Sequence, residues 1–248
     1  MPFATLNDVR LYYEEQGEGQ PVLLLHNYFG TLEVWSAQRE ALSRYCRVII
    51  ADARGHGRTL HPGGRLRLTD LAHDAARLMR FLDVAPTHIV GSSLGAQTAL
   101  HLAREEPHLV QTLTVIGPPH LTEPTAQGYM KRVEETFSTN ERRLELEHRD
   151  QGPGHARSVL LRNFALDREE KPEDQIKVLE LAGAITCPTL VVGGDDDPVF
   201  PIRRALELSE RIPNSELFIL PHGGHFPHRT MPNVCNEIVL DFLRRRSP

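Results

Sequence analysis

The sequence predicts an α/β fold with a mostly parallel eight-stranded sheet, helices on both faces and a small helical lid insertion. Three observations predict it. Short β-rich runs alternate with helical runs along most of the chain, which is typical of parallel sheets. Some of these runs, such as residues 21–26 and 46–51, are continuously apolar, as in strands buried on both faces. Between residues 120 and 183 the alternation stops.

Eight strand-like runs account for the predicted sheet. The first two are expected to form a hairpin, because the turn residues Asn7 and Asp8 separate them. The others are short runs between helical segments or turn residues, as expected for strands of a covered sheet. In chain order the runs are residues 3–6, 9–16, 21–26, 46–51, 88–91, 110–116, 189–193 and 216–220.

Helical segments separate these strands. The second of them carries leucines and alanines that fall on one helical face, and Thr69 or Asp70 is its expected N-cap. The segments are residues 35–45, 71–82, 94–105 and 202–211, with a last helix around residues 234–242.

The stretch that interrupts the alternation is rich in charged residues. Tyr129, Val133 and Phe137 recur in it at helical spacing. We therefore divide the chain into an α/β core, residues 1–119 and 184–248, and a helical insertion, residues 120–183. Because the insertion interrupts the strand–helix alternation, it is expected to act as a lid.

Composition argues against several classes of function. The 248 residues carry a formal net charge of −5 and a pI near 6.2, unlike proteins that bind nucleic acids through their phosphates. Neither a signal peptide nor an apolar run long enough to span a membrane is visible. Cys46, Cys187 and Cys235 are widely spaced and predict free thiols. We expect a cytoplasmic protein that binds no nucleic acid, membrane, metal or cofactor; its oligomeric state is not determined by the sequence.

Residues 91–95 read Gly-Ser-Ser-Leu-Gly and match the pattern G-x-S-x-G between a predicted strand and a predicted helix. In that context the turn is so tight that both glycines are needed, and Ser93 is lifted clear of the sheet edge. The N–H of Leu94 then lies at a helix N-terminus, where it can bind a developing oxyanion. Ser93 is the candidate nucleophile. Ser92 is its rival, and a plain strand–turn–helix corner is the alternative.

A nucleophilic serine needs a base and a group that orients the base, and this turn type takes them in the order serine, acid, histidine. Asp195–Asp197 follows a predicted strand, and one of its carboxylates can face the site. The other two are expected in a solvated turn or cap, with metal binding as the third option. Beyond the last strand, His225 is the candidate base, because it can swing over the sheet edge. His222 and His228 are expected at the surface.

Two further loops follow predicted strands. Residues 26–30 can offer a second backbone N–H to an oxyanion. Residues 52–57 are interpreted as a structural loop that Asp52 and Arg54 hold.

Together these segments resemble the α/β-hydrolase superfamily over nearly the whole chain. They read H-N-Y-F-G, D-A-R-G-H-G, G-S-S-L-G, G-D-D-D-P-V-F-P and G-G-H-F-P, in the order and near the spacings usual for that family. The resemblance implies that Ser93 is the nucleophile, Asp197 the acid and His225 the base. Asp197 is chosen because the family's acid directly precedes the Pro-Val-x-Pro stretch. The backbone N–H groups of Tyr28 and Leu94 would form the oxyanion hole.

Two positions depart from the family's usual pattern. Asn27 stands where H-G-x-x-G has its first glycine, and asparagine is among the few residues that tolerate a positive φ. Gly57–Arg58–Thr59 stands where G-x-S is common. The first of these loops is also similar to that of 3-oxoadipate enol-lactonases, at Asn27, Gly30, Thr31, Trp35 and Gln38.

The resemblance implies a serine hydrolase that cleaves a carboxylic ester or lactone of a small molecule through an acyl-enzyme on Ser93. One alternative is a C–C bond hydrolase or a cofactor-free haloperoxidase-like enzyme of the same fold. A second alternative is a non-catalytic receptor for a small ligand. The pocket is expected between the sheet edge and the insertion, and its candidate walls are Asn27, Phe29, Tyr129, Phe137, Phe164, Phe200 and Phe226.

Overall fold

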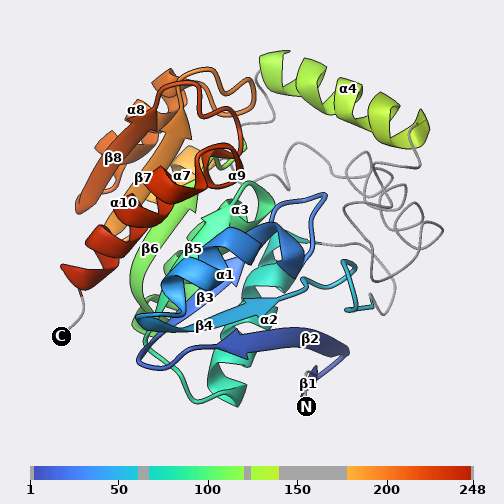
Figure 1. The fold of residues 1–248 in the computed structure, drawn as a ribbon, viewed down its shortest axis with the longest axis vertical. Helices are drawn as coiled ribbons and strands as arrows, with labels where there is room; N and C mark the ends of the chain where they lie inside the picture. The colour runs from blue at the N-terminus through green and yellow to red at the C-terminus, as the bar shows by residue number, and fades with distance from the viewer. Residues whose placement is uncertain (1–2, 61–66, 120–123, 140–177, 247–248) are drawn as a thin grey trace.

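A single sheet of eight strands organises the protein (Figure 1). The structure, a computed structural model, describes residues 3–60, 67–119, 124–139 and 178–246. The strands lie in the order β1-β2-β4-β3-β5-β6-β7-β8. The pairs β1–β2 and β2–β4 are antiparallel, and all other neighbours are parallel. The strands are β1 Phe3–Leu6, β2 Val9–Gln16, β3 Gln20–Leu25, β4 Cys46–Ala51, β5 Thr87–Ser92, β6 Val110–Ile116, β7 Thr189–Gly194 and β8 Ser215–Leu220.

Helices cover both faces of this sheet. Side chains of α2, α3, α7 and α8 pack with one set of strand residues, and those of α1 and α10 pack with the alternate set. In β3, for example, Leu23 faces the first group and Leu24 the second, because successive strand residues point to opposite faces. The helices are η1 Leu32–Trp35, α1 Ser36–Leu42, α2 Leu68–Phe81, α3 Leu94–Glu105, η2 Pro107–Leu109, α4 Pro124–Thr139, α7 Val178–Ala182, α8 Ile202–Arg211, α9 Pro227–Thr230 and α10 Pro232–Arg244. The predicted fold class is confirmed.

The start of α2 differs from the prediction. The N-cap is Arg67, and Asp70 is the third helical residue. One oxygen of Asp70 accepts the backbone N–H of Arg67 at 3.3 Å, so this carboxylate caps the helix from inside its first turn. The expectation that Thr69 or Asp70 would itself be the N-cap is therefore wrong.

Two helices represent the predicted insertion among the described residues. In Figure 1, α4 stands apart from the sheet at one end of the molecule. By contrast, α7 packs into the main core with α3 and α8. Residues 120–123 and 140–177 lie outside the described residues, and the division into core and lid remains a prediction.

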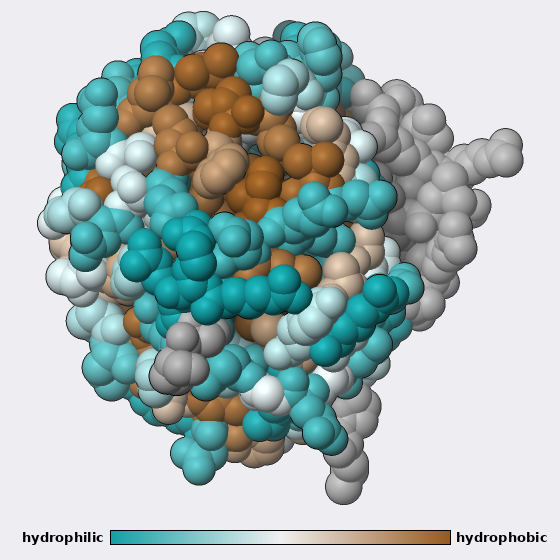
Figure 2. Space-filling model, turned by 60° about the vertical axis from the view of Figure 1, so that its left-hand side comes forward, coloured by the Kyte–Doolittle hydropathy of each residue, from teal (hydrophilic) through white to brown (hydrophobic). Residues whose placement is uncertain are grey.

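The end of the sheet at β8 carries exposed apolar side chains. In Figure 2 the side of the molecule with α8, β8 and α10 comes forward, and apolar surface gathers above a hydrophilic band. The exposed large apolar residues of these elements are Ile202, Leu206, Phe218 and Val234. Within the described ranges, no helix has both the length and the apolar character needed to cross a bilayer. The three cysteines are free thiols, as predicted.

Candidate active site

Ser93 occupies the turn between β5 and α3, with φ at 54° and ψ at −115°. A residue with a side chain rarely adopts such a positive φ outside functional turns. The flanking glycines make the turn possible. A Cβ on Gly91 would collide with the carbonyl oxygen of Gly95, and a Cβ on Gly95 would collide with the backbone at the end of β3. The sequence Gly-Ser-Ser-Leu-Gly thus holds Ser93 at the carboxyl end of β5.

The structure brings Ser93, His225 and Asp197 together. Oγ of Ser93 lies 3.0 Å from Nε2 of His225, and Nδ1 of His225 lies 2.9 Å from Oδ2 of Asp197. The three residues follow β5, β8 and β7, and the carboxyl ends of these parallel strands share one edge of the sheet. All three are buried. Ser92 lies within β5, fully buried, and its hydroxyl has no hydrogen-bond partner among the described residues.

The carboxylate of Asp197 is held on both oxygens. Oδ1 accepts the backbone N–H groups of Val199 at 2.7 Å and Phe200 at 3.0 Å. Its other oxygen is left for the imidazole of His225. Hydrogen bonds to a charged acceptor are short and directional, so they fix the plane of the carboxylate against the ring.

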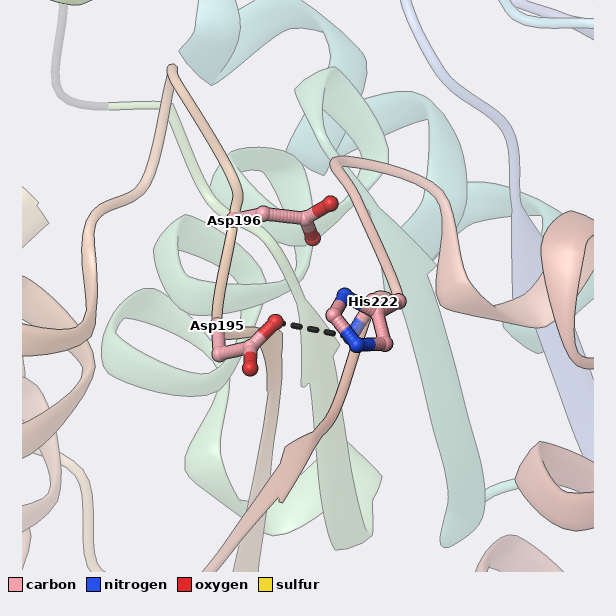
Figure 3. A group of neighbouring side chains, drawn as sticks. All are labelled: Asp195, Asp196 and His222. Atoms are coloured by element: carbon pink, nitrogen blue, oxygen red, sulfur yellow. Dashed lines mark hydrogen bonds between the residues drawn. The ribbon is translucent and has the colours of Figure 1, made fainter.

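The other two aspartates of this loop lie at the surface. Their side chains point toward the loop that carries His222 (Figure 3). Oδ1 of Asp195 accepts the backbone N–H of His222, and Oδ1 of Asp196 accepts that of Gly224, both at 2.7 Å. The carboxylates and the His222 ring are exposed, and one potential ligand atom from each lies within 4.8 Å of the others. These hydrogen bonds give the two aspartates a structural role. They tie the loop after β7 to the loop that carries His225.

His228 does not lie at the surface, and that expectation is wrong. Its ring is fully buried and packs against Trp35, with ring centroids 4.6 Å apart. The side-chain amide of Gln38 donates to the backbone carbonyl of His228 at 2.8 Å. Burial lowers the pKa of His228 to about 3, so its ring is neutral near pH 7. The ring faces Trp35 of η1, and the backbone carbonyl of His228 faces Gln38 of α1.

The oxyanion hole of Tyr28 and Leu94 stays a prediction, and both residues lie in segments at the carboxyl ends of neighbouring strands. Leu94 is the first residue of α3, so its N–H has no acceptor within the helix. Tyr28 belongs to the loop after β3, and β3 is the immediate neighbour of β5 in the sheet. The N–H of Gly30 donates to the carbonyl of Asn27 at 3.1 Å and closes this loop as a tight turn.

Three predicted wall residues lie in or beside this region. The ring centroid of His225 is 4.5 Å from that of Phe226 and 6.0 Å from that of Tyr129 on α4. Phe29 is buried and meets Tyr28 edge to face, with centroids 4.8 Å apart. Aromatic surface therefore flanks the imidazole of His225.

The remaining residues predicted for the pocket wall are Asn27, Phe200, Phe137 and Phe164. Asn27 is buried, and its Oδ1 has no hydrogen-bond partner in the part of the chain that the structure describes. Phe200 is 1% exposed and belongs to the main core, so its predicted place in a pocket wall is not supported. Phe164 and the side chain of Phe137 lie outside the described residues.

Sequence reasoning does not single out Gly117, which follows β6. Its φ is 55°, and a Cβ there would lie 3.1 Å from the carbonyl oxygen of His225 and 3.2 Å from Oδ2 of Asp197. A glycine is required at this position, both for its backbone conformation and for space beside the two side chains. The available signal is a glycine directly after a strand that neighbours the strand of Ser93.

The loop from Asp52 to Gly57 is structural, as predicted. Asp52 accepts the backbone N–H groups of Leu32 at 2.8 Å and Arg58 at 2.9 Å, although burial raises the pKa of its carboxyl. Arg54 forms a buried two-pronged ion pair with Asp74, at 2.6 and 2.7 Å.

Comparison with known proteins identifies the family. The sequence profile described as alpha/beta hydrolase fold matches residues 20–158 and 146–230, which together make up more than half of the chain. The chain belongs to the alpha/beta hydrolase fold family. The resemblance found in its motifs is thereby confirmed.

Relatives of this α/β hydrolase include enzymes of different substrate classes. It is 28% identical to RutD of Azorhizobium caulinodans, named as a carbamate hydrolase, over 98% of each chain. It is 28% identical to the pimeloyl-acyl carrier protein methyl ester esterase of Nitrosospira multiformis, over 96% of this chain and 100% of that protein. The enol-lactonase structure from Burkholderia xenovorans has a TM-score of 0.80 at 23% identity, covering 98% of this chain and 100% of that one. At that identity the match shows the shared fold.

Proposed function

We propose that this α/β hydrolase is a serine hydrolase that cleaves a carboxylic ester or lactone of a small molecule. The observation that carries the proposal is the hydrogen-bonded chain from Ser93 through His225 to Asp197, with distances of 3.0 and 2.9 Å. In this arrangement a neutral imidazole can take the serine proton while the carboxylate holds its other nitrogen. Hydrolysis is also supported by the relatives named as a carbamate hydrolase and an esterase.

Acylation begins when Oγ of Ser93 attacks the substrate carbonyl carbon and its proton passes to Nε2 of His225. The carbonyl oxygen becomes an oxyanion, to which the N–H groups of Tyr28 and Leu94 donate. The N-terminal end of α3 adds a favourable electrostatic contribution there. As the tetrahedral intermediate collapses, the bond to the leaving oxygen breaks and His225 returns its proton to that oxygen. The acyl group remains on Ser93.

Deacylation repeats these steps with water as the nucleophile. His225 accepts a proton from the water molecule, whose oxygen attacks the acyl carbon, and then returns the proton to Oγ of Ser93. An ester yields an acid and an alcohol. A lactone yields one hydroxy acid, because its leaving oxygen stays attached to the acyl chain.

The side chains around His225 support an apolar group beside the scissile bond. The rings of Tyr129 and Phe226 flank the imidazole, with centroids 6.0 and 4.5 Å from its own. Apolar walls with a small number of polar groups are typical of sites for small molecules.

Two measurements test the proposed function. Turnover of p-nitrophenyl esters and of lactones of graded chain length should be detectable, and a fluorophosphonate should modify the peptide that contains Ser93. The Ser92→Ala variant should be labelled like the wild type, and Ser93→Ala should not. Binding of such compounds without turnover would favour a receptor. Preferred cleavage of a C–C bond in a diketone would favour the C–C hydrolase alternative.

A further inference from the structure

Two buried histidines outside the Ser93–His225–Asp197 chain contact the loop that carries Tyr28. His26 begins this loop after β3, and His56 lies in the loop after β4. Their rings meet edge to face with centroids 5.0 Å apart, and they are 2% and 1% exposed. Their ring nitrogens contact backbone groups, and those contacts define where each proton lies.

The tautomer of His26 follows from one contact. Nε2 lies 2.9 Å from the backbone nitrogen of Ala53, which can only donate. Nε2 is therefore the acceptor and carries no proton. In the neutral ring the proton is on Nδ1, which lies 2.8 Å from the carbonyl oxygen of Asn27 and donates to it.

His56 faces two carbonyl oxygens. Nε2 lies 2.8 Å from that of Tyr28, and Nδ1 lies 3.1 Å from that of Arg54. Burial lowers the pKa of His56 to about 4, so near pH 7 the ring is neutral and has one N–H. We assign this N–H to Nε2, because the shorter distance marks the hydrogen bond.

These two hydrogen bonds fix the direction of backbone N–H groups. A trans peptide unit is planar, and its C=O and N–H bonds point in opposite directions. The bond from His26 to the Asn27 carbonyl, which also accepts the N–H of Gly30 at 3.1 Å, therefore helps to set the direction of the Tyr28 N–H. The bond from His56 to the Tyr28 carbonyl fixes the next peptide plane. Two successive peptide units of the loop are thus held by imidazole donors.

We propose that His26 and His56 are positioning residues for the Tyr28 N–H, which His26 aims at the carbonyl oxygen of the substrate. His56 steadies this direction by fixing the peptide unit on the other side of Tyr28, whose N–H belongs to Phe29. The inference rests on the proposed function, in which the Tyr28 N–H binds the oxyanion. A donor that points slightly away still allows the ester to bind, but it stabilises the tetrahedral state less. Loss of either positioning bond should therefore lower kcat and leave KM nearly unchanged.

Substitution by asparagine or by glutamine distinguishes the role of Nδ1 from that of Nε2 in each histidine. An asparagine side chain can place its N–H near the position of Nδ1, and a glutamine side chain can place it near that of Nε2. His26→Asn keeps the donor to Asn27, whereas His26→Gln loses it and keeps only an acceptor for Ala53. At position 56 the order is reversed, since His56→Gln keeps the donor to Tyr28 and His56→Asn loses it.

The expected result is a crossed pattern, in which glutamine lowers kcat at position 26 and asparagine lowers it at position 56. In His26→Gln and His56→Asn, kcat for a p-nitrophenyl ester should fall about 10- to 100-fold. In His26→Asn and His56→Gln it should fall less than about threefold, with KM nearly constant in all four variants. A trifluoromethyl ketone, which forms a tetrahedral adduct with a serine, should lose affinity in parallel with kcat.

A matched control is the buried His88 of β5, which contacts Oγ1 of Thr112 rather than the oxyanion loop. His88→Asn and His88→Gln should not show the crossed pattern in kcat. If both replacements at position 26 lower kcat equally, or if His26→Gln behaves like the wild type, the positioning role is wrong. The same holds at position 56 if Asn retains activity and Gln does not.

A measurement without turnover separates this inference from the proposed function. The amide signal of Tyr28 in a 1H–15N spectrum should stay near its wild-type position in His26→Asn and move in His26→Gln. A wild-type protein that hydrolyses no ester or lactone would overturn the proposed function, and the amide signal would still show whether His26 orients Tyr28. An unchanged Tyr28 signal in His26→Gln would overturn the inference even in an active enzyme.

Discussion

Oδ2 of Asp197 meets Nδ1 of His225 at 2.9 Å, although the two residues come from different loops, after β7 and β8. The two preceding residues, Asp195 and Asp196, bond to backbone N–H groups of the same β8 loop at its exposed side. Three successive aspartates therefore join the same two loops, but only the third faces the imidazole. This difference leads to distinct expectations for their amide variants.

Asp197→Asn should lower kcat about 10⁴-fold while the protein remains folded. The magnitude is the one seen when the aspartate of a serine protease triad becomes asparagine, because the amide stabilises the wrong imidazole tautomer. Asp195→Asn and Asp196→Asn should each lower kcat less than about tenfold, since an amide oxygen can still accept the backbone N–H. Steady-state kinetics of the three variants test this. A large loss at Asp195 or Asp196, with Asp197→Asn near wild type, would move the acid.

Ser93→Ala should lower kcat by at least about 10⁴-fold, as does removal of the nucleophile from other serine hydrolases. Ser92→Ala is the matched control, because Ser92 is adjacent in sequence and buried in β5, and its hydroxyl has no hydrogen-bond partner among the described residues. It should retain kcat within about threefold. Thermal unfolding of both variants should show that each is folded. Inactivity of Ser92→Ala together with an active Ser93→Ala variant would refute the choice of nucleophile.

The parts of the site that sequence predicts are those with a local cause. The turn at Ser93 needs glycine on both sides, so the five residues from Gly91 to Gly95 are enough to predict it. The sequence signal for the end of a strand is local as well, because a continuous apolar run stops where the chain leaves the sheet. Parallel strands then bring their carboxyl ends to one edge. This is why loops far apart in sequence could be expected at one site.

The parts that sequence does not predict depend on distant residues. His228 is buried because of two residues that are far away in the chain. Trp35 packs against its ring, and Gln38 donates a hydrogen bond to its backbone carbonyl. The prediction that His228 lies at the surface could not include these contacts, because both partners are far away in the sequence. Likewise, the need for glycine at Gly117 arises from His225 and Asp197, which approach it only in the folded protein.

Gly117→Ala should lower kcat without unfolding the protein. The added Cβ would lie 3.1 to 3.2 Å from atoms of His225 and Asp197, at a φ of 55° that alanine tolerates poorly. A displacement of about 1 Å in catalytic groups can cost about 100-fold in rate, so we expect a loss of about 10- to 100-fold. Gly183→Ala is the control, because its Cβ would meet no atom within 4 Å. Equal kcat in the two variants would contradict the prediction.

Stability should fall as the pH drops from about 6.5 toward 4. Burial lowers the pKa of His56 and His88 to about 4 and that of His228 to about 3. In the unfolded chain a histidine titrates near pH 6.5, so below that pH the unfolded state binds protons that the folded state does not. Each buried histidine then lowers the free energy of unfolding by up to about 1.4 kcal/mol per pH unit. The effect ends when the pH reaches the folded-state pKa.

His228→Met isolates one of these contributions. Neither ring nitrogen of His228 has a hydrogen-bond partner among the described residues, so an apolar side chain of similar size should not lower stability at pH 7. Methionine can also pack against Trp35. Urea unfolding at pH 7, 6, 5 and 4.5 should show a slope reduced by up to about 1.4 kcal/mol per pH unit relative to the wild type. His88→Met should reduce the slope as well but lower stability at pH 7, because Thr112 loses the contact at 2.8 Å. An unchanged slope in His228→Met would mean that this ring is not neutral in the folded protein.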